Sequence, residues 1–231
     1  YGSVINVYAG LINSWDSSDY FGGSDAYTVK NVVPAWNAAG GQVAMDMESS
    51  TVSEDVMAVD SRAVDAPASI VANSNPTTVY YFNEDATIPT ALENSIVIKG
   101  GEAENVTLVD GKSLYIPESF VAKEILYKRT PSVYADGTSG WETIVLPFDV
   151  EEVTADGKEI DWFHSSSDTN KDFGLKEFVG VSGTTLLYDH VDAWTANTPY
   201  IIAIPGNKWG AEHDLTGKEI VFKGNNVEVK I

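Results

Sequence analysis

The chain has 231 residues, and its hydrophobic content of 43% is enough for a packed core and argues against wholesale disorder. Its 34 acidic and 14 basic residues give a formal net charge of −20, which repels phosphate backbones and anionic membrane surfaces and so argues against nucleic acid as a partner. Because cysteine is absent, disulfides, a thiol nucleophile and zinc sites built on sulfur are excluded.

Residues 1–66 carry only a weak pattern. The runs SVINVYAGLI and AYTVKNVVPAW are each consistent with a strand, and WNAAGGQVAMDM could begin a short helix, although its glycines argue against one. An acidic stretch then ends at Pro67, and we place a boundary or linker at residues 62–68. Two alternatives stay open: residues 1–66 are an N-terminal β-rich segment of a preceding domain, or they add strands to the module at 67–231.

From residue 68 onward, short strand-like runs follow one another. In chain order they are TVYYF, SIVIK, NVTLVD, SLYI, AKEILYKRT, ETIVLP, EIDWF, LKEFVGV, TTLLYD, YIIAIP, KEIVFKG and NVEVKI. Turn dipeptides separate them, including Asp110-Gly111, Asp156-Gly157 and Ser182-Gly183. Many short strands at spacings of about 8–12 residues predict an all-β chain with little helix, folded as an antiparallel β-sandwich of Greek-key or jelly-roll type.

The stretch GWETIVLPFDV, residues 140–150, alternates like a strand until Pro147 stops it. A proline cannot donate to a sheet ladder, so the strand ends there or lies at an edge. Phe148 can still bury its ring while Asp149 turns the chain outward. We interpret Leu-Pro-Phe-Asp as a bend by which the chain passes from one sheet to the other, which is a structural role.

Three motifs together carry a family resemblance: NSNPTTVYYF (73–82), GWETIVLPFDV (140–150) and ANTPYIIAIPG (196–206). Their combination and order resemble an all-β module that recurs in secreted and surface proteins of Bacteroidetes-type bacteria, over roughly residues 70–231. The resemblance implies export and an envelope or extracellular location, often as one module of a longer protein. It implies no reaction and carries over no catalytic residue.

Within those motifs, four residues look like packing or bend positions of the fold. They are Trp141, Pro147, Pro199 and Tyr200.

The three histidines, His164, His190 and His213, each stand near an acidic residue. A catalytic triad needs a nucleophile on a sharp turn, but no Gly-x-Ser-x-Gly elbow is present, and Ser139 in GTSG is better explained as part of a loop. The spacings typical of zinc ligands are also missing. With so many acids in the chain, these are interpreted as loop or surface histidines, and we assign no catalytic residue.

The stretch DTNKDFGLKE is the nearest thing to a calcium loop. Asp168, Asn170 and Asp172 occupy the first, third and fifth positions, where a hard cation takes oxygen ligands. Phe173 stands where the loop needs glycine, and Glu177 comes two places too early. A polar hairpin loop explains the stretch equally well, so we assign no metal site and no cofactor.

Two tryptophans are the candidate binding residues. Trp194 in DAWTAN and Trp209 in GNKWGAE stand in polar, loop-like settings, where exposed aromatic faces can hold sugars by stacking. The competing interpretation, which we favour, is that each ring closes one end of the core. Of the two, we expect Trp209 to be exposed, because Gly206, Asn207 and Gly210 offer no apolar contact, and Trp194 to pack.

We therefore expect a non-catalytic binding or structural module of an exported, extracellular or outer-surface protein, which acts in adhesion or protein–protein interaction. Its expected partners are other protein modules or surface glycans. Two alternatives stay open: a carbohydrate-binding module of a polysaccharide-utilisation system, and a hydrolase with an unrecognised site. No apolar run reaches the roughly 20 residues that cross a bilayer. The opening YGSVINVYAG has no basic-then-apolar leader, so we interpret the chain as a mature or excised piece. The oligomeric state is not indicated.

Overall fold

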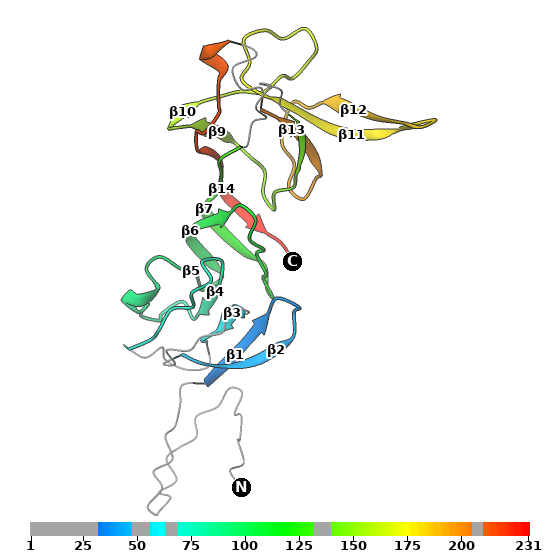
Figure 1. Cartoon of the computed structure of the whole chain (residues 1–231). Helices are drawn as coiled ribbons and strands as arrows, with labels where there is room; N and C mark the ends of the chain where they lie inside the picture. Colours follow the sequence, from blue (N-terminus) through cyan, green and yellow to red (C-terminus); the bar gives the residue numbers. More distant parts are fainter. Residues whose placement is uncertain (1–31, 48–55, 63–68, 132–139, 205–209) are drawn as a thin grey trace, which may run out of the picture. The chain divides into compact units, whose positions relative to one another are not determined.

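The computed structural model describes residues 32–47, 56–62, 69–131, 140–204 and 210–231. These residues form an all-β structure whose only helical elements are short 3-10 turns, among them η2 (Thr90–Leu92) and η4 (Ala211–His213), which confirms the predicted class. The strands are β1 Val32–Asn37, β2 Gln42–Asp46, β3 Val56–Asp60, β4 Val79–Phe82, β5 Ile96–Lys99, β6 Glu102–Val109, β7 Phe120–Arg129, β8 Trp141–Ile144, β9 Glu152–Ala155, β10 Lys158–Glu159, β11 Gly174–Ser182, β12 Thr185–His190, β13 Tyr200–Ala203 and β14 Ile220–Val229 (Figure 1).

The chain divides into two compact units. Unit 1 extends to Glu104 and includes Lys112–Phe120, and unit 2 consists of Asn105–Gly111 and Val121–Lys230. Most of the boundary expected at residues 62–68 falls outside the described residues, so that division stays a prediction.

Unit 1 contains a stack of parallel strands. Its strand order is β2-β1-β3-β4-β5, with β1 antiparallel to β2 and to β3, and with β3–β4 and β4–β5 parallel. Ala58 lies beside Val79, and Val79 lies beside Ile96, so successive rungs are 79 − 58 = 21 and 96 − 79 = 17 residues apart. This arrangement suggests a β-solenoid rather than the predicted antiparallel sandwich. The first four residues of β3 and all four of β4 are buried, as parallel strands require, in place of alternating.

The segment WNAAGG forms a hairpin turn, and the short helix considered from the sequence is absent there. The Asn37 side-chain oxygen accepts hydrogen bonds from the N–H groups of Ala39 (3.0 Å) and Gly41 (2.9 Å). Gly40 has φ 75°, a left-handed conformation that glycine adopts at no steric cost. The side chain of Asn37 therefore closes the turn that joins β1 to β2.

Residues of the NSNPTT motif form a network of buried hydrogen bonds just before β4. The Asn73 side-chain amide donates to the Val56 carbonyl (3.1 Å), and the Thr78 hydroxyl donates to the same oxygen (2.8 Å). The Tyr80 hydroxyl accepts from the Asn73 N–H at 2.7 Å. Buried polar groups need such partners, so the first motif of the family resemblance holds two rungs together, which is a structural role.

Unit 2 contains two sheets. One has the order β10-β9-β14-β7-β6, and the other is four-stranded with the order β12-β11-β13-β8. Pairing is antiparallel between β9 and β10, β9 and β14, β11 and β12, β11 and β13, and β8 and β13. The Trp194 ring contacts Tyr200 of one sheet (centroids 5.3 Å apart) and Phe222 of the other (5.4 Å), so apolar side chains of both sheets meet around it.

The Leu-Pro-Phe-Asp segment carries the chain from one sheet to the other, as predicted. It follows β8, at one end of the four-stranded sheet, and precedes β9 of the other sheet. Phe148 is buried. The Leu146 carbonyl accepts from the Asn197 N–H (2.7 Å), and the Asp149 carboxylate accepts from the Ala196 N–H (2.6 Å). The second and third motifs of the resemblance are thus hydrogen-bonded to each other.

Candidate functional site

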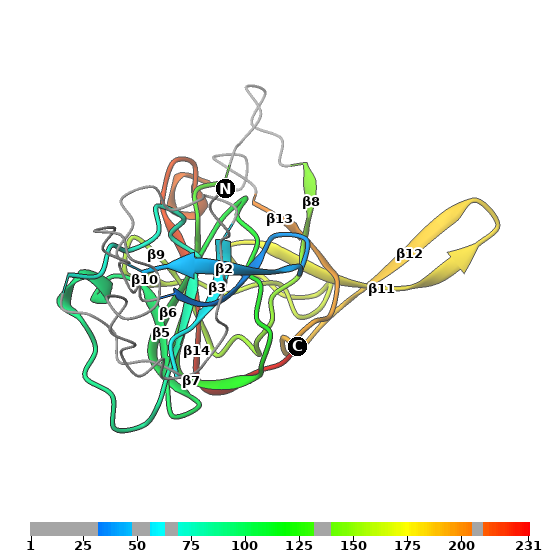
Figure 2. The ribbon, with the colours of Figure 1, turned by 90° about the horizontal axis from the view of Figure 1, so that it is seen from below.

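The β11–β12 hairpin extends beyond the sheet that anchors it. Only Gly174–Glu177 of β11 pair with β13, whereas pairing with β12 continues to Ser182. Beyond Glu177 the hairpin is therefore a two-stranded ribbon, closed at the predicted Ser182-Gly183 turn, where Gly183 has φ 63°. Figure 2 shows this ribbon projecting from the rest of its unit. We call residues Phe178–Tyr188 the hairpin arm.

The hairpin arm exposes apolar side chains in place of burying them. Exposed fractions are 46% for Phe178, 59% for Val179, 59% for Val181, 58% for Leu186 and 41% for Leu187. An isolated two-stranded ribbon is only marginally stable in water, and contiguous exposed apolar patches mark interaction sites. The arm is therefore the strongest candidate interaction surface among the described residues.

One face of the arm is continuous. Phe178 lies opposite Tyr188, and Val181 lies opposite Leu186, so these four side chains share a face. The rings of Phe178 and Tyr188 are 5.7 Å apart in an edge-to-face contact. Leu187 points to the other face, so neither side of the arm is polar along its length.

The arm carries no charge in a chain whose net charge is −20. The nearest charged residues stand at its base, where Glu177 and Asp189 lie directly opposite each other. Two like charges in this position destabilise a strand pair. The acids thus mark the point where the charged body of unit 2 gives way to an apolar ribbon.

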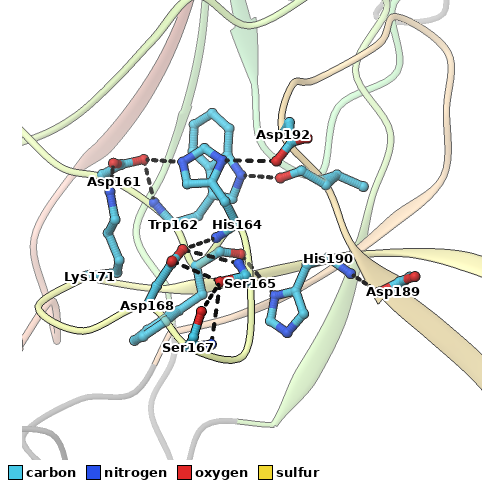
Figure 3. Close-up of polar contacts among 12 residues, drawn as sticks. Asp161, Trp162, His164, Ser165, Ser167, Asp168, Lys171, Asp189, His190 and Asp192 are labelled. Carbon is cyan, nitrogen blue, oxygen red and sulfur yellow. Dashed lines mark hydrogen bonds and ion pairs between the residues drawn. The ribbon is translucent and has the colours of Figure 1, made fainter.

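A second candidate is the loop Asp161–Phe173, which leads into β11 (Figure 3). Its two ends are joined by backbone hydrogen bonds from Asp172 N–H to the Asp161 carbonyl (2.8 Å) and from Phe163 N–H to the Phe173 carbonyl (3.1 Å). Trp162 donates its indole N–H to the Val191 carbonyl at 2.9 Å and lies 4.7 Å from the His164 ring. The loop is therefore tied down at its ends.

Asp168 organises the inside of this loop. Its carboxylate accepts the N–H groups of His164 (2.8 Å) and Ser165 (3.0 Å) and the Ser165 hydroxyl (2.8 Å). The same hydroxyl lies 2.9 Å from the Ser167 hydroxyl, so Ser165 is directed at Asp168 and Ser167 and not at the adjacent imidazole. The Ser-His-Asp geometry that nucleophilic catalysis needs is not formed here.

All three histidines contact this loop, although they are far apart in the sequence. His164 Nε2 lies 3.2 Å from Asp161, and His213 Nδ1 lies 3.1 Å from Asp172. His190, at the end of β12, has its Nδ1 3.0 Å from the Phe163 carbonyl. The sequence interpretation of unconnected loop or surface histidines missed this convergence, because η4 and β12 reach the loop only through the tertiary fold.

The calcium-like pattern does not converge on a cation. Asp168 is engaged by backbone N–H groups, whereas Asp172 accepts from the Asp161 N–H (3.0 Å) and contacts His213. Within the described part of the chain, no cluster of three or more His, Asp or Glu side chains is arranged to hold a metal ion. The carboxylates of Asp168 and Asp172 are thus engaged in hydrogen bonds within the loop, which fits the polar hairpin loop that the sequence also allowed.

Two carboxylates of the loop, those of Asp161 and Asp168, are held in their charged forms. Burial raises the pKa of Asp161, but hydrogen bonds, led by that from the Lys171 ammonium, outweigh it and leave this pKa below its ordinary value. The Ser165 hydroxyl, together with backbone N–H groups, lowers the pKa of Asp168. The charged form of Lys171 is favoured as well, because the hydrogen bond of its ammonium group to Asp161 raises the pKa of Lys171.

We predict that acid loosens this loop. Carboxylates with lowered pKa values bind protons less readily in the folded loop, so their stabilisation is complete above about pH 4 and is lost as the pH falls through the lowered values. The indole N–H of Trp162 should exchange slowly at about pH 5 and much faster near pH 2.5, measured by NMR. Asp168→Ala should move the onset toward neutral pH. Slow exchange that persists to about pH 2 in both proteins would contradict this account.

The two tryptophans proposed as binding residues have different outcomes. Trp194 is 5% exposed and contacts the Trp162, Tyr200 and Phe222 rings, so it packs as expected and has no free face for a sugar. Trp209 lies outside the described residues.

Another tryptophan takes the exposed position. Trp141, interpreted from the sequence as a packing residue, is 50% exposed. A Cβ added to Gly174 would lie 3.0 Å from its Cη2 atom, so the ring lies over the backbone of β11. Its position at the start of β8 in the Trp-x-Thr motif did not reveal that exposure.

No protein-family model matches the chain, and no match is found among curated proteins or among solved structures. The resemblance to the Bacteroidetes module therefore stays a prediction that rests on its three motifs. Among the described residues, none of the helices combines the length and the apolar composition that crossing a bilayer requires.

Proposed function

We propose that the chain is a non-catalytic interaction module of an exported cell-surface protein and that it acts through the hairpin arm. The observation that carries the proposal is the exposed apolar ribbon of β11 and β12, which its own sheet leaves uncovered. Apolar and aromatic side chains that become buried at the centre of a contact are typical of protein–protein interfaces. Export and a surface location follow from the family resemblance alone and are part of the proposal.

The loop Asp161–Phe173 supports this function indirectly. It precedes β11, and His190 at the end of β12 binds its Phe163 carbonyl. The ion pair of Lys171 and Asp161 adds a further tie within the loop. These contacts hold the base of the arm, so the polar network has a structural role and the apolar ribbon has the binding role.

The proposal is tested with the purified chain on beads, mixed with bacterial cells and with collagen, fibronectin and fibrinogen. Val181→Lys places a charge in the middle of the arm, and we expect it to weaken the tightest observed interaction about tenfold or more. Val145→Lys is the matched control, because Val145 is 52% exposed but lies outside the arm. Equal binding by the two variants, or no binding by the unaltered chain, would refute an adhesive function of the arm toward cells and these proteins.

A carbohydrate-binding module is the second candidate, and the half-exposed Trp141 favours it. The ring reaches Gly174 of β11 and is half exposed, so part of its aromatic surface is available to stack on a sugar. A glycan array probed with the chain and with Trp141→Ala tests this. Recognition that is lost in Trp141→Ala but kept in Val181→Lys would support this second function and not the first.

A further inference from the structure

We propose that the hairpin arm joins two copies of this chain, through antiparallel pairing of the outer edge of β12 in one copy with the same edge in the other. The proposal rests on the proposed function, because it names the partner of the arm. It follows from three features of the described residues: the free edge of β12, the order of side chains along it, and the distribution of charge.

The outer edge of β12 is open and unprotected. β12 is the terminal strand of its sheet, and among the described residues no strand pairs with its other side. Natural edge strands are usually blunted by charges, proline or a bulge. From Thr185 to Tyr188 the strand has neither a charge nor a proline, and the bulge at Val179 is in β11 on the inner side. Such an edge presents free N–H and C=O groups for another strand.

The side chains of β12 favour one register for a symmetric pair. If the two-fold axis passes beside Leu187, Leu187 of one chain lies opposite Leu187 of the other. Leu186 of one chain then lies opposite Tyr188 of the other. Asp189 then lies opposite Thr185, so no carboxylate faces an apolar residue or a second carboxylate. A shift of the axis to Tyr188 would place Leu187 opposite Asp189. An axis at Leu186 would place Leu187 opposite Thr185 and Tyr188 opposite Thr184, so the axis at Leu187 gives the best match of apolar side chains.

Among the described residues, the uncharged arm is a surface through which two copies can approach with little repulsion. Each copy has a net charge of −20, but the arm is uncharged, and its tip is the part of the ribbon farthest from the anchoring strand β13. Repulsion between the bodies is screened beyond a distance of about 8 Å at physiological salt. A lipid surface is a poorer partner, because the tip Ser182–Thr185 is polar and a bilayer would leave the edge of β12 without hydrogen bonds.

The contact is small, so the dimer is expected to be weak. Exposed patches of this kind measure on the order of 300–600 Å². Two arms and the paired edges together bury about 1,000 Å², near the lower limit of specific interfaces. A dissociation constant in the micromolar range is expected, which suits a contact that many copies make together on one surface.

The absence of cysteine from the chain permits a sharp test of register. In the proposed pair, Cα atoms of the two Leu187→Cys residues lie about 5 Å apart, within disulfide range. The two Thr185→Cys residues are four positions apart along the strands, about 13 Å, which is too far. Under mild oxidation Leu187→Cys should form covalent dimers at least about tenfold faster than Thr185→Cys and Val145→Cys. Equal rates in all three variants would overturn the pairing.

Sedimentation of the unaltered chain supplies the second measurement. We expect reversible dimers that strengthen between about 0.05 and 0.5 M NaCl, because salt screens the repulsion of the acidic bodies. Leu187→Lys should raise the dissociation constant of the dimer about tenfold or more. Its thermal unfolding temperature should equal that of the control variant Val145→Lys. Monomers at every soluble concentration would overturn the proposal, as would equal dimerisation of Leu187→Lys.

Three further outcomes separate this inference from the function on which it rests. Bead binding that Val181→Lys abolishes, by a chain that stays monomeric in solution, overturns the dimer and leaves the interaction function standing. Binding of the monomeric chain to phosphatidylcholine vesicles overturns the dimer in favour of lipid. Dimers with the Leu187 register, in a chain whose beads bind none of the probes, support the pairing and refute the wider adhesive function.

Discussion

Deletion of residues 1–66 is expected to unfold unit 1 and leave unit 2 folded. One buried cluster spans both sides of the deletion point, and six of its ten members precede residue 67: Val33, Ala35, Met45, Met47, Val56 and Val59. The others are Ile70, Tyr80, Phe82 and Leu92. Burial of each large apolar side chain contributes about 1.5–3 kcal/mol, so the loss is on the order of 10 kcal/mol and comparable with the stability of a whole domain.

The deletion also removes β3, the parallel neighbour of β4. Without it, Tyr80 and Tyr81, which are both buried in the intact chain, would stand in an edge strand and face water. Thermal unfolding and NMR of a chain of residues 67–231 test this. Resonances around Phe222 in unit 2 should stay dispersed, whereas those around Tyr80 should collapse. A fully dispersed spectrum would instead show that residues 67–231 fold independently, as the sequence division suggested.

The positions of most strands could be predicted, but their partners could not. TVYYF and SIVIK coincide with β4 and β5, because β-branched and aromatic residues between turn signals identify strands locally. Their parallel pairing depends on where the chain returns after each excursion, which no local pattern encodes. SLYI at 113–116 was predicted as a strand and is irregular in the structure. VMAVD at 56–60 forms β3, although the surrounding acidic stretch concealed it.

The strands and the turn of the hairpin arm could be predicted from the sequence, but the exposure of its apolar side chains could not. LKEFVGV and TTLLYD were identified as neighbouring strands with a turn at Ser182-Gly183, and they form β11 and β12. Apolar residues in a strand normally indicate a buried face, so no local pattern indicated that the arm is exposed. Its exposure follows from the length of β13, whose four residues cover β11 only as far as Glu177. The meeting of three histidines at one loop is equally a property of the tertiary fold.

Phe148→Ala is expected to destabilise unit 2 by about 3–5 kcal/mol. Phe148 is 1% exposed and lies in the segment that leads from β8 to β9. A Cβ added to Gly224 would lie 2.8 Å from the Phe148 ring and 3.3 Å from Ile125, so the ring packs directly on the backbone of β14 where a side chain of β7 also converges. Truncation would leave a cavity that rigid sheets on both sides cannot close.

Chemical denaturation of Phe148→Ala and of control variants shows whether the loss of stability comes from the packing of the Phe148 ring or follows any substitution near the bend. Val145→Ala, three residues earlier and 52% exposed, should change the free energy of unfolding by less than about 0.5 kcal/mol. Phe148→Leu keeps most of the apolar volume and should recover more than half of the loss caused by alanine. If Phe148→Ala costs under about 1 kcal/mol, the ring is not what holds the chain at its passage between the sheets. The hydrogen bonds of Leu146 and Asp149 to the Ala196-Asn197 turn would then be sufficient to fix it.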